Sequence, residues 1–160
     1  MLYISTGRKP SVTTRKLARL LSLILNAKYE NRGKRSVDDV CERAEKSGCS
    51  RIAFIYEKKG NPSSIQFFDS EKGWLKEEFI IAGVVVPEFE KRKRIPQQME
   101  VKSDDENGKK IIRLLGLEES DEFPSPLHGI FSGRGMEFLL NNEKILFLKG
   151  KLIESPKTHD

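Results

Sequence analysis

The sequence predicts a layered α/β fold in which strands and helices alternate along the chain. Residues 51–57 are apolar on both faces, which is typical of a central strand covered on both sides. Before them, two amphipathic helical patterns each follow a short strand-like run. The 160 residues are 37% hydrophobic and 33% charged, which fits one globular domain or two small packed halves with a core that needs no disulfide or metal.

A strand over Leu2–Thr6 and a helix from Ser11 or Thr13 to about Asn26 are expected to open the fold. The loop between them contains a glycine and a proline, which interrupt regular structure. Four aliphatic residues of the helix recur at i, i+3, i+4 and i+7, so they form one apolar stripe. The stripe comprises Leu17, Leu20, Leu21 and Ile24, and the opposite face carries Arg15 and Arg19.

A second helix is expected to begin at Ser36, because Asp39 three residues later approximates a capping box. The carboxylates of Asp38 and Asp39 also suit the positive end of the helix dipole. Gly48 is a good C-terminal stop, and a short strand over Ala27–Arg32 precedes this helix. Its buried face is expected to comprise Val37, Val40, Cys41 and Ala44.

The remaining elements are read from shorter patterns. Ser64–Asp69 and Phe79–Val86 are predicted to be strands, the first of them after a turn at Lys58–Pro62. Ile95–Asp105 is polar and is expected to be an irregular crossing, and Asn107 is expected to cap a short helix. The chain then continues with the helix Gly108–Leu115, an acidic loop over Ser120–Pro126, and strands over Leu127–Phe131, Glu137–Leu140 and Lys144–Lys149. The last two strands are joined as a hairpin at Asn141-Asn142, and Ser155–Asp160 is a frayed tail.

Charge is distributed unevenly along the chain. Residues 1–35 hold nine Lys or Arg and a single acid, Glu30, whereas acids gather at 104–106 and 118–122. A basic N-terminal third on a chain of net charge +5 suggests an anionic partner on one side. A second basic cluster at 91–94 is explained by ordinary solvated surface charge.

No catalytic, cofactor or metal site is predicted. The loop Gly7–Ser11 lacks the second glycine and the Gly-Lys-Ser/Thr ending of a phosphate-binding loop, and Gly133–Gly135 opens no helix with a third glycine. His128 has no motif that pairs it with a nucleophile or an orienting acid. Cys41, expected in the core, and Cys49, expected to be half-buried, lack zinc-ligand spacing and are expected to be reduced thiols. The protein is therefore expected to have no cofactor, no small-molecule substrate and no enzymatic activity.

No membrane segment is expected either. The longest apolar stretch, Phe79–Val86, is far too short to span a bilayer. Met1–Thr6 is a short strand-like run followed by charge, unlike a signal peptide. These features predict a cytoplasmic protein.

Three loop motifs carry the most information. They are Ser-Thr-Gly-Arg-Lys-Pro-Ser at 5–11 followed by Thr14-Arg15, Asn-Arg-Gly-Lys at 31–34, and Gly-Asn-Pro at 60–62. In this order of strands and helices, the set resembles the Brix-domain family of ribosome-biogenesis proteins, from about Tyr3 to Ile153. The chain lacks the long terminal extensions of eukaryotic members, so it is similar to the short archaeal ones.

The resemblance implies a fold of two related, tightly packed α/β halves, at approximately 1–86 and 87–155, within a single domain. Each half would be similar to the anticodon-binding domain of class IIa aminoacyl-tRNA synthetases. The resemblance also implies binding of rRNA or pre-rRNA, association with other ribosome-assembly proteins, and a role in rRNA processing and subunit assembly.

The charged residues of these loops also indicate RNA binding, independently of the resemblance. Cations at a strand-to-helix loop can contact phosphates, helped by backbone N–H groups at the helix start. Tyr3, Tyr29 and Trp74 could stack on bases, but packing in the core or at a sheet edge is the commoner role of such residues. The residues predicted to bind RNA are Arg8, Lys9, Arg15, Arg19, Arg32, Lys34 and Arg35.

Two other functions fit the same sequence. One is a protein-interaction module within pre-ribosomal complexes, with incidental RNA contact. The other, which rests on fold analogy alone, is a tRNA-binding accessory domain.

Overall fold

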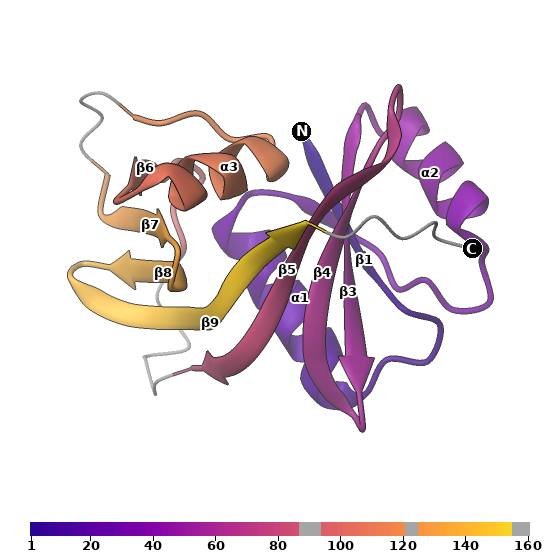
Figure 1. Ribbon diagram of the computed structural model, residues 1–160, viewed down its shortest axis with the longest axis horizontal. Coiled ribbons are helices and arrows are strands. Elements are labelled where there is room, and N and C mark those ends of the chain that lie inside the picture. The colour runs from indigo at the N-terminus through magenta and orange to yellow at the C-terminus, as the bar shows by residue number, and fades with distance from the viewer. Residues whose placement is uncertain (87–93, 121–124, 155–160) are drawn as a thin grey trace.

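A single nine-stranded sheet with three helices makes up the computed structural model, which describes residues 1–86, 94–120 and 125–154 (Figure 1). The strands lie in the order β2-β1-β3-β4-β5-β9-β8-β7-β6. The strands are β1 Leu2–Thr6, β2 Lys28–Tyr29, β3 Arg51–Lys58, β4 Asn61–Asp69, β5 Gly73–Val85, β6 Glu100–Ser103, β7 Leu127–Ser132, β8 Gly135–Leu140 and β9 Glu143–Glu154. The helices are α1 Val12–Ile24, α2 Val37–Lys46 and α3 Glu106–Leu114.

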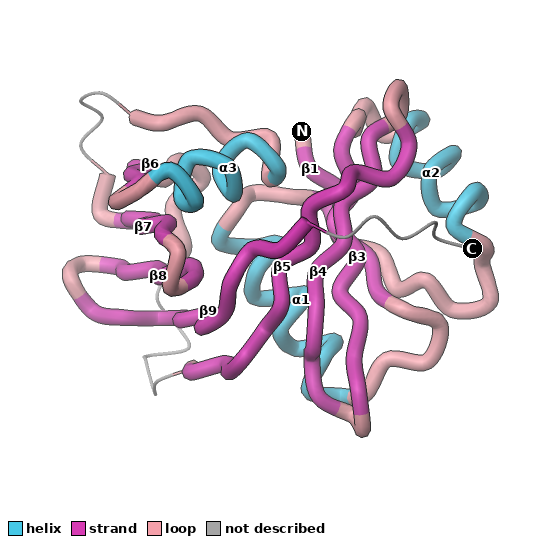
Figure 2. The backbone as a smooth tube through the Cα atoms, viewed as in Figure 1, coloured by secondary structure: helices cyan, strands magenta, loops and turns pink. Residues whose placement is uncertain are grey.

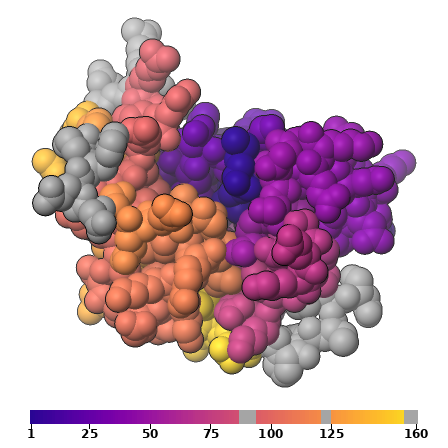
Figure 3. Space-filling model, turned by 90° about the horizontal axis from the view of Figure 1, so that it is seen from above, coloured from indigo at the N-terminus to yellow at the C-terminus, as the bar shows by residue number. Residues whose placement is uncertain are grey.

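The strand pairing repeats across the sheet. In the first half β1 runs parallel to β3, and β4 and β5 follow antiparallel. In the second half β6 runs parallel to β7, and β8 and β9 follow antiparallel. The two sets meet where β5 pairs with β9, so they form one continuous layer (Figure 2). Seen from above, they form two lobes side by side with the N-terminus between them (Figure 3). The division between residues 86 and 87 stays a prediction, because residues 87–93 lie outside the described part.

The prediction of a central strand at residues 51–57 is confirmed. In β3, Ala53 and Ile55 belong to the cluster that includes the leucines of α1, which lies behind β4 and β5 in Figure 1. Ile52 and Phe54 of the same strand belong to a second cluster with α2. The strand therefore buries both of its faces, one against each helix.

Local signals place the first two helices correctly. The Ser11 side chain caps α1 by accepting from the Thr14 N–H. At α2, the Ser36 hydroxyl accepts from the Asp39 N–H and the Asp39 carboxylate accepts from the Ser36 N–H, both at 3.1 Å. The expected capping box is therefore present. Among the three helices of the described ranges, none combines the length and the apolar character needed to span a bilayer.

Several boundaries differ from the prediction. The helix α3 is capped by Asp105 rather than Asn107, because the Asp105 carboxylate accepts from the Gly108 N–H at 2.8 Å. The stretch predicted to be an irregular crossing contains β6, which its parallel partner β7 stabilises. The strand β5 begins at Gly73 rather than Phe79, and β2 is only two residues long.

The hairpin prediction at Asn141-Asn142 is confirmed, since both residues have positive φ, 52° and 67°, as a tight hairpin turn requires. The cysteine assignments were the wrong way round: Cys49 is buried and Cys41 is half-buried. Most of the expected acidic loop and of the 91–94 cluster, and the whole 155–160 tail, lie outside the described residues.

Candidate nucleic-acid interface

The three loop motifs meet at one edge of the sheet. Because β1, β2 and β3 are parallel neighbours, the loops that follow them leave from the same side. The Gly7 N–H donates to the Ile55 carbonyl at 3.2 Å. The Ser11 hydroxyl donates to the Gly60 carbonyl at 2.7 Å, so the first and third motifs touch. The Ser5 hydroxyl donates to the Glu30 carbonyl at 2.9 Å and holds the start of the second motif beside them.

Most of the predicted RNA-binding residues lie around this edge. Arg8, Lys9, Arg19 and Lys34 are exposed, and Arg15 is half-buried. Within the described ranges, none of these five side chains forms an ion pair or a hydrogen bond with another residue, so their charges are available to a ligand. We call the following set the basic edge: Arg8, Lys9, Arg15, Arg19, Lys34, Lys58 and Lys59.

Arg32 does not belong to this surface, contrary to the prediction. Arg32 is only 9% exposed, and its Nε donates to the Arg35 carbonyl at 2.9 Å. The guanidinium also lies beside the Tyr56 hydroxyl, where it opposes the rise that burial causes in the pKa of Tyr56. Arg32 therefore stabilises the loop over residues 31–35 from its buried side. The sequence pattern alone could not distinguish Arg32 from its exposed neighbours.

Arg35 is partly committed to the protein. It pairs with Glu30 at 3.1 Å and donates to the Asn31 carbonyl at 3.0 Å. Glu30 also pairs with Arg43 at 2.6 Å and accepts from the Tyr3 hydroxyl. These partners hold the pKa of the Glu30 carboxyl below its usual value, against the effect of burial. Arg35 consequently contributes less free charge than its exposed neighbours.

Lys58 and Lys59 were missed by the sequence prediction. They occupy the end of β3 and the turn before Gly60, and both are exposed. The contact of Ser11 with Gly60 places them beside the loop that carries Arg8 and Lys9. The usable signal was the Gly-Asn-Pro motif, which directly follows both lysines.

The start of α1 is occupied by a carboxylate from within the protein. Glu57 accepts from the Ser11 N–H at 3.1 Å and from the Thr14 hydroxyl. These hydrogen bonds, led by that from Thr14, hold the pKa of the Glu57 carboxyl below its usual value. The expected contribution of the helix start to phosphate binding is therefore reduced.

This arrangement predicts a pH dependence of stability. Because the folded state lowers the pKa of Glu57, its stabilising contribution is present above the unfolded value of about 4.3 and is lost as the pH falls through the folded pKa. Glu57→Gln should unfold at a lower temperature than the parent at pH 6, and the gap should narrow by pH 3. Thermal unfolding across this range measures it, with the exposed Glu42→Gln as the control. A gap independent of pH would contradict the assignment.

Of the aromatic residues considered for stacking, only Tyr29 lies at the basic edge. It is half-buried, and Arg15 and Arg19 oppose the rise that burial causes in its pKa. Tyr3 is buried, and burial together with its bond to Glu30 raises the pKa of Tyr3 to about 12. Trp74 packs against the rings of Phe54 and Phe68, with centroid distances of 5.3 and 5.4 Å.

The corresponding edge of the second half is acidic. Asp104, Asp105 and Glu106 follow β6, at the position that Gly7 and Arg8 hold after β1. Asp105 accepts from the Gly133 N–H at 2.9 Å, which joins the loops after β6 and β7. The two halves therefore present opposite charge at equivalent ends of their strands.

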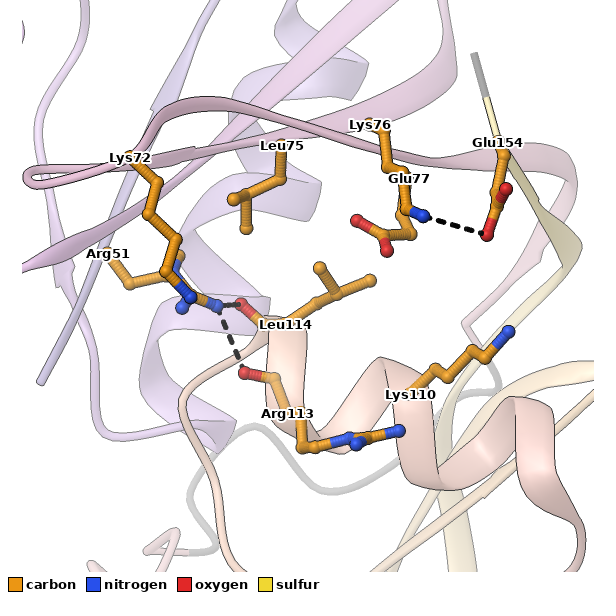
Figure 4. Close-up of a pocket in the computed structure, with 9 residues that line it drawn as sticks. All are labelled: Arg51, Lys72, Leu75, Lys76, Glu77, Lys110, Arg113, Leu114 and Glu154. Atoms are coloured by element: carbon orange, nitrogen blue, oxygen red, sulfur yellow. Dashed lines mark hydrogen bonds and ion pairs between the residues drawn. The ribbon is translucent and has the colours of Figure 1, made fainter. Parts of the chain in front are cut away.

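A pocket of about 320 Å³ lies between the halves (Figure 4). Arg51 projects from β3 into this junction and donates to the carbonyls of Arg113 and Leu114 at 3.0 and 2.8 Å. It also pairs with Asp69 at 3.1 Å. The pocket is lined by several cations, but Arg51 caps the C-terminus of α3 and thereby joins the halves.

Arg51→Ala should lower the free energy of unfolding by about 1–3 kcal/mol, because the last carbonyls of α3 and the Asp69 carboxylate lose a charged donor. Chemical denaturation measures the change. Lys72→Ala, an exposed cation of the same pocket, is the control and should stay within about 0.5 kcal/mol of the parent. Equal effects of the two variants would show that Arg51 does not join the halves.

His128 has an acidic neighbour that the sequence did not reveal. Its Nδ1 lies 3.1 Å from the Glu100 carboxylate, which also pairs with Lys102 at 3.0 Å. No group of three His, Cys, Asp or Glu side chains within the described ranges is placed to hold a metal ion. The pair lies across the parallel strands β6 and β7, where it links their exposed faces.

No protein-family model matches the chain. Curated relatives do match it. A protein of Methanothermobacter thermautotrophicus, named as a probable Brix domain-containing ribosomal biogenesis protein, is 33% identical over 122 residues, which are 73% of this chain and 71% of that protein. The chain belongs to the Brix-domain family.

Other members of the Brix-domain family match over shorter stretches. Proteins with the same name from Archaeoglobus fulgidus and Saccharolobus solfataricus are 36% and 32% identical over 84 and 87 residues. These matches cover 52% and 54% of this chain and span about half the length of each relative, 52% and 51%.

Solved structures share the fold of this Brix-domain chain. The crystal structure of Mil, described as an archaeal Imp4-like protein, is 26% identical, with a TM-score of 0.71 over 97% of this chain and 100% of that chain. A probable ribosomal biogenesis protein from Aeropyrum pernix K1 is 17% identical, with a TM-score of 0.74 over 99% and 98%. The second comparison shows that the fold is shared.

Proposed function

We propose that this Brix-domain chain is a cytoplasmic ribosome biogenesis factor that binds pre-rRNA and assists rRNA processing and subunit assembly. The observation that carries the proposal is the gathering of unpaired cations at the carboxyl ends of three parallel strands. The names of its relatives as ribosomal biogenesis proteins support the same assignment. Other ribosome-assembly proteins are the expected protein partners.

The mechanism requires binding without turnover. Cations of the basic edge contact phosphates and supply affinity, while the shape of the folded RNA supplies specificity. Bound in this way, the protein holds a transient RNA fold or duplex until assembly proceeds. A similarity of each half to the anticodon-binding domain of class IIa aminoacyl-tRNA synthetases is part of this proposal, since that domain type also binds RNA.

Competition between RNA classes tests the proposal. Purified protein should bind particular rRNA fragments more tightly than tRNA at matched salt. A preference for tRNA would favour the accessory tRNA-binding function instead. Equal, weak binding of every RNA would contradict specific rRNA recognition.

A second candidate function is a protein-interaction module. The exposed valines at the end of β5, Val85 and Val86, and the acidic edge of the second half favour it. The two functions separate under salt, because an interface built on apolar contacts survives salt that strips RNA. A protein that binds no RNA at low salt yet comigrates with assembly intermediates would establish the module in place of RNA binding.

A further inference from the structure

One face of the sheet is only partly covered by a helix. The buried residues of α2, Val40 and Ala44, cluster with residues of β1 and β3, whereas α1 and α3 pack on the opposite face. Over β5, β9 and β8 the same face carries the directly opposed pairs Ile80 with Lys151, Gly83 with Lys149, and Glu137 with Phe147. Within the described ranges, this central part of the face has no helix packed on it.

A pocket of about 580 Å³ opens on this uncovered face, where the two halves of the sheet join. Its floor is apolar and includes Ile80, Ala82 and the half-buried ring of Phe147. Its charged lining residues are all cations, namely Arg134 from the β7–β8 turn and Lys149 and Lys151 from β9. An apolar floor with a cationic rim suits a ligand that is both flat and anionic.

The acidic side chains on the same face do not cancel these cations. Glu137 pairs with Lys144 at 3.7 Å, and Glu100 pairs with Lys102 at 3.0 Å. Glu78 accepts from the Gln66 amide at 3.3 Å. By contrast, the side chains of Arg134, Lys149 and Lys151 form no ion pair or hydrogen bond with any residue that the structure describes, so the rim keeps a positive potential.

We propose that this pocket is a second RNA contact, which takes a base of single-stranded RNA on Phe147 and its phosphates on Arg134, Lys149 and Lys151. This inference rests on the proposed function and adds a surface separate from the basic edge. The side chains of Lys149 and Lys151 project from the same side of β9. Their Cα atoms lie roughly 6.7 Å apart, so the two cations form a row along which an RNA backbone can run. Aromatic rings beside cations on an open sheet are a common platform for unpaired bases.

The surroundings of Phe147 accommodate a base. The Lys144 ammonium lies 5.2 Å from the ring centroid, so one ring face already accepts a group in that position. The Lys144 side chain is 42% exposed, so a base can replace its ammonium over the ring while the ammonium keeps its ion pair with Glu137. A duplex offers no free base face to this ring, which makes the pocket selective for single strands.

Substitution of the ring tests the proposal directly. Phe147→Leu keeps an apolar side chain but removes the stacking surface, and Phe147→Tyr keeps the ring. The probes are a uridine-only oligoribonucleotide and a fully paired hairpin of matched charge. Phe147→Leu should weaken binding of the single strand by about fivefold to a hundredfold and leave the hairpin unchanged, whereas Phe147→Tyr should bind both probes like the parent. Thermal unfolding of each variant verifies that it is folded.

The outcomes separate this inference from the proposed function. If folded Phe147→Leu binds the single strand as tightly as the parent while charge reversal at the basic edge weakens it, the pocket assignment is wrong and the rRNA-binding function stands. If neither change alters RNA binding, both the pocket assignment and the proposed rRNA-binding function are wrong. If Phe147→Leu leaves RNA binding intact but abolishes association with an assembly protein, the pocket docks a protein and the inference is overturned.

Discussion

Replacing Arg15 and Arg19 with glutamate is expected to weaken binding of single-stranded rRNA fragments by about a hundredfold or more at low salt. Each arginine supplies a charged donor to a phosphate, a contact worth about 1.5–3 kcal/mol, and each glutamate repels the backbone. Stability should change by less than about 0.5 kcal/mol, because Arg19 is exposed, the half-buried Arg15 side chain forms no ion pair or hydrogen bond with a described residue, and glutamate suits a helix as well as arginine does. Fluorescence anisotropy and chemical denaturation measure the two quantities.

The control variant has the same change in net charge, but its substitutions lie away from the basic edge. Lys46→Glu with Lys109→Glu alters net charge by the same amount on the exposed faces of α2 and α3. This variant should bind RNA within a fewfold of the parent. Equal weakening by both double variants would mean that overall charge, and not the basic edge, governs binding.

Gly150→Ala is expected to lower the free energy of unfolding by about 3 kcal/mol or more, the upper range for an overpacked site. Gly150 lies on β9 opposite Ile81, at the junction of the two halves. A methyl group there would lie 2.1 Å from the Ile80 carbonyl oxygen and 2.9 Å from the Phe79 ring. Because the obstacle is backbone, the β5–β9 ladder must separate to relieve it, and the two halves of the sheet come apart together.

A nearby glycine on the same ladder provides the matched control. Gly83 pairs with Lys149, and a methyl group there meets nothing within 4 Å. Gly83→Ala should therefore stay within about 0.5 kcal/mol of the parent in the same denaturation experiment. If Gly150→Ala lowers the free energy of unfolding no more than Gly83→Ala does, the junction between β5 and β9 tolerates displacement of the strands.

The sequence was most informative where structure depends on neighbours along the chain. The capping box at Ser36, the apolar stripe of α1 and the Asn141-Asn142 turn involve residues only a few positions apart, and each is present. The strand β6 was not predicted because its short, polar sequence is held by pairing with β7, whose partner residues lie 28 positions further along the chain.

The candidate site was likewise predictable only where it depends on residues that are close together in the sequence. Clustering of cations near the N-terminus located the basic edge, but its composition depends on tertiary contacts. Arg32 is removed from it by burial, and Lys58 and Lys59 join it because β3 lies parallel to β1. The Phe147 pocket combines β5, β9 and the β7–β8 turn, so no single stretch of sequence could indicate it.

The affinity of the purified protein for rRNA fragments across a salt series tests the central claim most directly. We expect a log–log slope of about −3, equivalent to roughly four single-strand phosphate contacts, with preference for particular fragments. Reversal of Arg15 and Arg19 should bring that slope about 1.4 closer to zero, since two contacts are lost. A flat slope, or no binding at low salt, would contradict direct rRNA recognition and leave the basic edge as solvated surface.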